Sequence, residues 1–232
     1  MHQVNQSGKG FKAVAADAIL KVGDGRGFVV ECRNYLGRIE RIIITAAHCL
    51  PKLPSCHPGR YVEEETSARL LGPLGTQPTI WAACLFADPV ADIAVLGQPD
   101  NQALHEEADA YDQLMADMAT LAVADAPAQG FEVVTGFGGR PIKKPTPGKG
   151  PARVLSLKGQ WLDGQVMRRG GWLEFKPGKF FEGGMSGSPI VNAAGAAIGV
   201  VSVDSMSPVI VDGLSASLVR RIRRQGRRST TA

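Results

Sequence analysis

Three short segments, each at the end or the start of a β-rich run, most constrain what this chain can fold into. They are residues 45–49, 91–96 and 183–189, and they carry His48, Asp92 and Ser186 in that order. A serine hydroxyl is a weak nucleophile near neutral pH unless an imidazole removes its proton and a carboxylate orients that imidazole. A fold that brings the three segments together would therefore build a catalytic triad.

The residues around these positions, and the spacings of 44 and 94 positions between them, resemble those of chymotrypsin-like (trypsin-like) serine peptidases of bacterial type. The resemblance covers residues 13–224. It implies an all-β fold of two six-stranded antiparallel barrels with a short C-terminal helix. The implied organisation is an N-terminal segment (1–12), a first barrel with His48 and Asp92 (13–100), an acidic inter-barrel segment (101–130), a second barrel with Ser186 (131–213), and a C-terminal helix with a basic tail (214–232).

Composition agrees with one or two small domains, because 44% of the 232 residues are hydrophobic. No run of about 18 apolar residues is present, so we expect no membrane-spanning helix. The net charge of +4 comes from six arginines in the last 13 residues, and the rest of the chain carries −2. These arginines lack interleaved aromatic residues, which favours a solvated surface over a nucleic-acid partner.

The first ten residues are polar and lack the apolar centre of a signal peptide. We expect a cytoplasmic protein if Met1 is the native start, and a secreted or periplasmic one if a leader has been removed.

β-Rich runs separated by Gly and Pro predict the strands. In the first half they cover residues 28–32, 39–45, 70–71, 79–86 and 93–96, and in the second half 131–136, 152–157, 171–175, 188–192 and 197–203. Residues 136–138 resemble the glycine–aromatic–glycine turn that opens the family's second barrel. Residues 102–124 predict a short helix or an acidic linker, and Leu214, Leu218 and Ile222 share one face of a terminal helix.

Gly183 and Gly184 permit backbone angles that let the Gly184 and Ser186 amides point at one developing oxyanion. Asp88 competes with Asp92 as the acid, but it precedes a proline and lacks a following strand. Ser202 resembles the serine that supports the catalytic aspartate in the family. The family resemblance also implies that Val203 and Asp204 pair with the substrate backbone.

The family count places Phe180 at the base of the specificity pocket, and Val209 would narrow its wall. We therefore expect cleavage after small or medium apolar residues, with Asp204 as the feature that could reverse this. Many animal relatives activate through an aspartate before the nucleophile. Met185 occupies that position here, so we expect either local apolar packing or a partner to hold the turn, and no dependence on a new N-terminus.

The four cysteines leave several states open. Cys32 and Cys49 lie where the family commonly has a disulfide, but they could equally be a reduced, buried pair. Cys56 and Cys84 could also bridge, because spacing alone does not decide pairing. A zinc site from Cys49, Cys56 and His57 would compete with the role of His48. We expect no metal and no organic cofactor.

Together these features predict a monomeric serine endopeptidase that acts on protein or peptide substrates and does not act at a membrane. Two other classes remain as alternatives. One is a binding or sensor module with a protease fold and a misaligned triad, and the other is a serine hydrolase that cleaves only esters.

Overall fold

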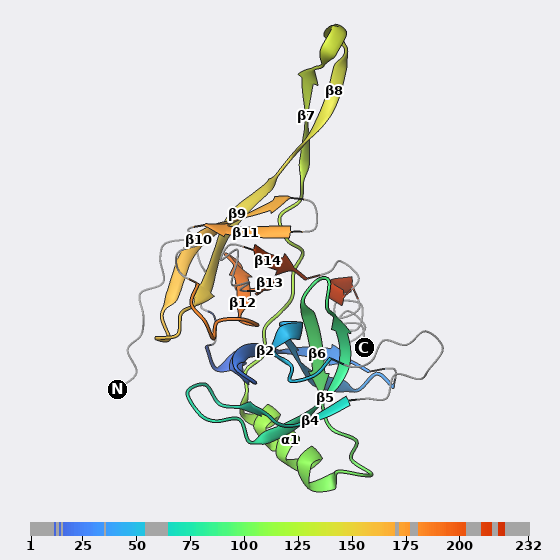
Figure 1. Ribbon diagram of the computed structural model, residues 1–232, viewed down its shortest axis with the longest axis vertical. Coiled ribbons are helices and arrows are strands. Elements are labelled where there is room, and N and C mark those ends of the chain that lie inside the picture. Colours follow the sequence, from blue (N-terminus) through green and yellow to red (C-terminus); the bar gives the residue numbers. More distant parts are fainter. Residues whose placement is uncertain are drawn as a thin grey trace, which may run out of the picture.

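Two closed, six-stranded antiparallel β-barrels make up most of the described chain (Figure 1). The computed structural model describes residues 12, 14, 16–34, 36–53, 65–169, 172–176, 181–202, 210–214 and 218–220. The predicted two-barrel fold is confirmed.

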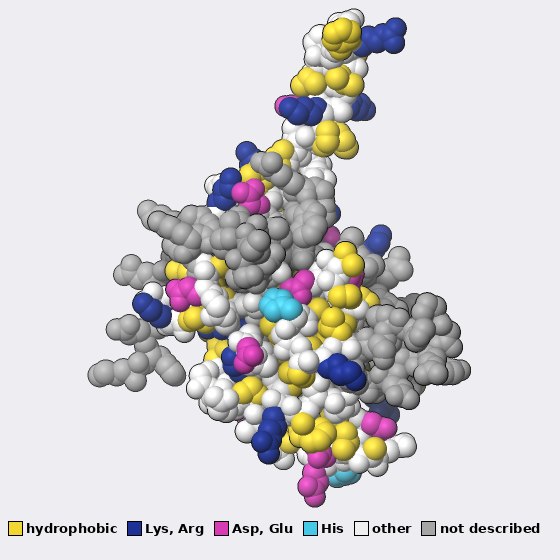
Figure 2. Space-filling view, viewed as in Figure 1, with side chains coloured by type: hydrophobic (Ala, Val, Ile, Leu, Met, Phe, Trp, Pro, Cys, Tyr) yellow, Lys and Arg dark blue, Asp and Glu magenta, His cyan; other side chains and the backbone are white. Residues whose placement is uncertain are grey.

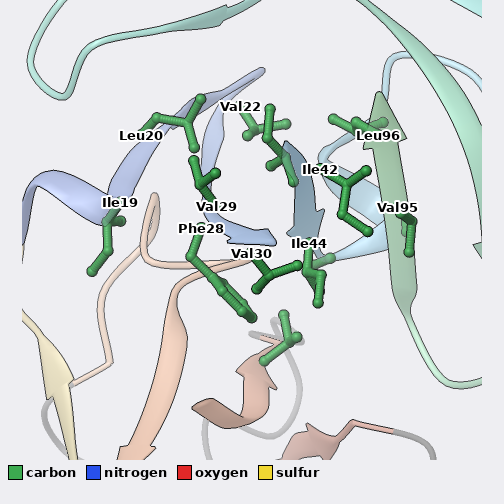
Figure 3. Close-up of a cluster of buried hydrophobic side chains, with 14 of the residues drawn as sticks. Ile19, Leu20, Val22, Phe28, Val29, Val30, Ile42, Ile44, Val95 and Leu96 are labelled. Carbon is green, nitrogen blue, oxygen red and sulfur yellow. The ribbon is translucent and has the colours of Figure 1, made fainter. Parts of the chain in front are cut away.

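The first barrel has the strand order β1-β2-β3-β6-β5-β4 and follows a short 3-10 helix, η1 (Ala16–Ala18). Its strands are β1 (Ile19–Val22), β2 (Gly25–Arg33), β3 (Ile39–Thr45), β4 (Glu65–Gly72), β5 (Ile80–Asp88) and β6 (Ile93–Gly97). Apolar side chains of β1, β2, β3 and β6 form one buried cluster (Figure 3). Residues 25–30 of β2 are buried on both faces, which explains why they read as a continuous run rather than an alternating one.

The second barrel has the strand order β10-β11-β14-β13-β12-β9. Its strands are β9 (Gly148–Leu155), β10 (Trp161–Arg169), β11 (Trp172–Lys176), β12 (Pro189–Asn192), β13 (Ala197–Val201) and β14 (Ile210–Gly213). A second buried cluster fills it, with Phe175, Met185 and Ile190 among its largest members.

The helix predicted between the barrels is present as α1 (His105–Asp117). Buried Tyr111 and Met115 attach it to the first barrel, and the Tyr111 hydroxyl donates to the Arg41 carbonyl at 3.0 Å. Beyond α1 the backbone makes hydrogen bonds to both barrels. The Leu121 N–H donates to Val29 O in the first barrel, and the Ala124 N–H donates to Ala197 O in the second. The segment thus ties the two barrels together.

One predicted strand belongs elsewhere. Residues 131–136 do form a strand, β7 (Gly130–Thr135), but it pairs only with β8 (Pro141–Thr146) in a separate two-stranded sheet. Residues 136–138 do not open the second barrel, because they lie at the tip of this hairpin beside a 3-10 turn, η3 (Phe137–Gly139). The alternating pattern of β7 is typical of any strand and does not say which sheet the strand joins.

Of the predicted terminal helix, residues 218–220 are helical and Val219 is buried; Ile222 and the arginines after Arg220 lie outside the described residues. No helix in the described ranges is long and apolar enough to cross a membrane.

Candidate active site

Strand pairing brings His48 and Asp92 together. β3 and β6 pair antiparallel, with Thr45 opposite Ala94. The same register continues past the strand ends, where the Ala47 N–H donates to the Asp92 carbonyl at 3.1 Å. A short 3-10 turn, η2 (Ala47–Cys49), then turns His48 toward Asp92. The 44-residue separation is therefore the length of the excursion through β4 and β5 between two neighbouring strands.

Asp92 receives two hydrogen bonds from His48. The imidazole Nδ1 lies 2.7 Å from Asp92 Oδ2, and the His48 backbone N–H donates to Asp92 Oδ1 at 3.0 Å. An ionised carboxylate only accepts hydrogen bonds, so the Nδ1 atom carries the proton and Nε2 is left as the acceptor. This hydrogen bond raises the pKa of His48 above its ordinary value, against a smaller effect of burial.

Ser202, which directly follows β13 of the second barrel, supplies a third hydrogen bond to Asp92. Its hydroxyl donates to Asp92 Oδ2 at 2.5 Å. Burial disfavours the ionised Asp92 carboxylate, but the hydrogen bonds from His48 and Ser202 outweigh burial and lower its pKa. Asp92 also has a backbone φ of 45°, a left-handed conformation that aspartate tolerates better than most residues. The structure thus places the Ser202 hydroxyl against the Asp92 carboxylate.

The turn around Ser186 contains two glycines with a left-handed backbone. Gly184 and Gly187 have φ of 89° and 81°, in the region that favours glycine. Met185 between them is fully buried among apolar side chains of the second barrel, as expected from the sequence. Among the hydrogen bonds of the described residues, none has the N–H of Gly184 or Ser186 as its donor. Both amides remain available for a ligand oxygen.

Gly25 lies between the histidine segment and the nucleophile. A Cβ atom at Gly25 would lie 2.4 Å from Cys49 Sγ and 2.6 Å from the Ser186 carbonyl oxygen. Ser186 is therefore adjacent to the turn that carries His48. No hydrogen bond of the described residues joins the Ser186 hydroxyl to His48. Such bonds are often long in the absence of substrate.

Arg26 is a residue of this site that the sequence reasoning missed. Its side chain is 6% exposed and crosses to the second barrel, where it donates to Leu155 O at 2.7 Å and Ser156 O at 3.1 Å. Its backbone N–H donates to the Ser186 carbonyl at 2.7 Å, and its own carbonyl accepts from the Thr45 hydroxyl at 2.7 Å. Arginine is usually exposed, so only its place inside a continuous β-rich run could have indicated burial.

The proposed Cys32–Cys49 disulfide is wrong, because both thiols are free. Cys49 Sγ faces Gly25, whereas Cys32 lies seven residues further along β2, opposite Glu40. Seven residues of strand span about 23 Å, and a disulfide needs Cα atoms within about 7 Å. Burial raises the pKa of each thiol to about 11, so neither is a reactive thiolate near neutral pH. Cys84 is also free.

Asp88 has a different role from Asp92. Its side chain accepts hydrogen bonds from the Val90 and Ala91 N–H groups, both at 3.0 Å, and so closes the turn before β6. Several residues named from the sequence lie outside the described residues. They are Phe180 and Val209 of the expected specificity pocket, Val203 and Asp204, which were expected to pair with the substrate, and Cys56 and His57 of the alternative zinc site. Within the described ranges, no cluster of three or more potential ligands could hold a metal ion.

Residues 25–200, which include all three triad candidates, match the family of trypsin-like peptidase domains. The chain belongs to this family. The match to a trypsin-like peptidase domain makes this chain a serine endopeptidase with peptide substrates.

Solved structures with similar folds are also proteases. The inactive form of the Rv3671c protease is 17% identical, with a TM-score of 0.40, and the match covers 90% of this chain and 89% of that one. The serine protease of a human pathogenic astrovirus is 14% identical, with a TM-score of 0.46 and coverage of 91% and 98%. The serine endoprotease from Yersinia pestis is 14% identical, with a TM-score of 0.44 and coverage of 93% of this chain and 64% of that one. No curated protein matches the chain.

Proposed function

We propose that Ser186, His48 and Asp92 form the catalytic triad and cleave peptide bonds through an acyl-enzyme. The observation that carries the proposal is the set of three hydrogen bonds to Asp92, two from His48 and one from Ser202. A carboxylate held this way keeps Nε2 of His48 unprotonated and stabilises the imidazolium that forms when Nε2 takes a proton.

In the proposed reaction, the Ser186 oxygen attacks the carbonyl carbon of the peptide bond while His48 Nε2 takes the hydroxyl proton. The Gly184 and Ser186 amides donate to the negative oxygen of the tetrahedral intermediate. His48 then gives the proton to the leaving amine, and an acyl-enzyme ester remains on Ser186. A water molecule, deprotonated by His48, hydrolyses this ester and restores the free serine.

Substrate recognition would follow the same frame. We propose that the chain after Ser202, with Val203 and Asp204, pairs with the substrate backbone as an added strand. Phe180 at the pocket base would offer bulk without charge and favour small or medium apolar residues before the cleaved bond. A peptide-library digest analysed by mass spectrometry tests this preference, and cleavage mainly after Lys or Arg would contradict it.

A fluorophosphonate probe tests the triad directly, because only an activated serine reacts with it. We expect labelling of the wild-type protein, none of Ser186→Ala, and turnover of a peptide substrate lowered at least about a thousandfold in Ser186→Ala. Folded protein without labelling or turnover would favour the binding-module alternative. Labelling and ester hydrolysis with no cleavage of denatured protein would favour an esterase.

Ser188→Ala is the matched control, since it removes a second hydroxyl from the same turn. Ser188 is fully buried, and its Oγ has no hydrogen-bond partner among the described residues. Removing an unsatisfied buried hydroxyl should leave turnover unchanged and stabilise the fold by about 1 kcal/mol. That gain would raise the melting temperature by about 2–4 °C.

A further inference from the structure

The β7–β8 hairpin projects from the second barrel and buries almost none of its own apolar surface (Figure 1). Phe131 and Val133 are 71% and 68% exposed, Ile142 is 54% exposed, and Phe137 at the tip is fully exposed. A two-stranded hairpin alone in water is marginally stable, and clustered exposed apolar side chains mark interaction sites. These exposed apolar side chains therefore mark the β7–β8 hairpin as a candidate interaction site.

The hairpin is also basic, which limits the kind of partner that fits. Lys144 lies 4.0 Å from Glu132, but Arg140 and Lys143 have no acidic partner among the described residues. Lys143 stands opposite Val133 in the register, so a cation and an apolar side chain share one face. Figure 2 shows apolar and basic side chains together along this projection. The complementary surface is acidic and partly apolar.

The same chain carries such a surface between β3 and α1. A groove of about 780 Å³ lies there, with Ile39 and Leu85 as its exposed apolar side chains. Its charged lining consists of three acids, Glu31, Glu40 and Asp112, and one cation, Arg41, which lies 3.7 Å from Glu31. Burial and, to a smaller extent, the nearby Asp109 raise the pKa of Asp112. The rest of α1 adds further negative charge and contains no Lys or Arg.

The hairpin and α1 lie at opposite ends of the longest axis of the molecule (Figure 1), so a hairpin does not reach the groove of its own chain. We propose that the β7–β8 hairpin of one molecule docks in the β3–α1 groove of a second copy. The two surfaces differ, so the contact is head-to-tail and joins copies into a ring or an open chain. This association is independent of the triad and corrects the expectation of a monomer if it is found.

Analytical ultracentrifugation of the full chain, with Ser186→Ala to prevent self-cleavage, tests the contact. We expect the average mass at about 100 µM protein to exceed that of a monomer. The dissociation constant should weaken at least about tenfold between about 0.05 M and 0.5 M salt, because the contact pairs opposite charges. A protein that stays monomeric at low salt overturns the proposal.

Charge reversal identifies the two surfaces. Arg140→Glu with Lys143→Glu makes the hairpin acidic, and Glu40→Lys with Asp112→Lys makes the groove basic. Each double variant alone should be monomeric, while an equimolar mixture should associate again, because each altered surface then meets a complementary one. Lys158→Glu is the control for a general charge effect, because Lys158 lies in the turn between β9 and β10, outside both surfaces. This variant should associate like the protein that carries Ser186→Ala alone.

Two further results would overturn the proposal. One is an oligomer that persists in either double variant with unchanged thermal melting. The other is a protein that does not self-associate but co-floats with anionic phosphatidylserine vesicles, in a way that depends on Phe137 and Lys143. That result would assign the hairpin to a membrane surface. Phe131→Ser with Phe137→Ser tests the apolar contribution, and it should weaken self-association with the fold intact.

Discussion

Replacing Arg26 by methionine should lower both stability and turnover, because this one side chain connects the two barrels behind the nucleophile. The guanidinium donates to the carbonyls of Leu155 and Ser156 in a nearly closed environment. Methionine keeps most of the volume but leaves both carbonyls without this donor. Each unsatisfied carbonyl lowers the free energy of unfolding by about 1–3 kcal/mol. Burial lowers the pKa of Arg26, so removing its charge also relieves a desolvation cost that offsets part of this loss.

The expected net loss is about 2 kcal/mol of unfolding free energy. In a chain of this size, such a loss lowers the melting temperature by about 4–8 °C. The Arg26 N–H also donates to the Ser186 carbonyl, so the shifted backbone should misplace the nucleophile. A misplacement that raises the barrier by about 1.4 kcal/mol lowers kcat tenfold, while KM changes little.

Circular-dichroism melting and steady-state kinetics on a chromogenic peptide, well below the melting temperature, measure the two effects separately. Arg26→Lys keeps the charge but loses the two-pronged donor, so we expect it to recover part of the stability and part of kcat. The reasoning is refuted if Arg26→Met melts like the wild type with an unchanged kcat. If kcat falls only in proportion to the unfolded fraction, Arg26 has no positioning role.

Three other predictions concern the same site. In the proposed mechanism neutral His48 is the active form. Asp92 raises the pKa of His48, so kcat/KM should fall with decreasing pH around a midpoint above about 6.5. Asp92→Asn should lower this midpoint, and a pH profile without that shift would contradict the pairing. Gly25→Ala should reduce kcat/KM more than tenfold by pressing on Cys49 and Ser186, and Cys49→Ala should restore only part of it, as measured on the same peptide. Deletion of residues 1–7 should leave activity within a few-fold, because buried Met185 has no charge for a new N-terminal amine; strict dependence on one new N-terminus would refute this.

The sequence could predict the parts of the site that depend on local pattern. His48, Asp92 and Ser202 each sit beside the end of a β-rich run, and adjacent strands then bring these ends together. It could not predict contacts that depend on register across sheets. Cys32 and Cys49 fitted a family spacing, yet the register of β2 with β3 places them at different ends of β2.

The β7–β8 hairpin and Arg26 were missed for a related reason. Alternation in residues 131–136 indicates a strand, but the choice between barrel and hairpin is made by pairing partners distant in the chain. An arginine in a strand usually faces solvent, and only the carbonyls at the end of β9 make burial of Arg26 favourable. Local patterns report which residues form strands, and long-range pairing decides what those strands surround.

The site is assembled across the barrel interface, so its chemistry depends on how the barrels pack. Asp92 comes from the first barrel and accepts from Ser202 of the second, while Ser186 of the second accepts from Arg26 of the first. Val201, next to Ser202, accepts from the Gly187 N–H beside the nucleophile at 2.7 Å. A shift of one barrel against the other would therefore displace Ser186 relative to His48 and Asp92. Mutations at the interface that never touch substrate should consequently change kcat and stability in parallel, whereas those in the distant β7–β8 hairpin should change neither.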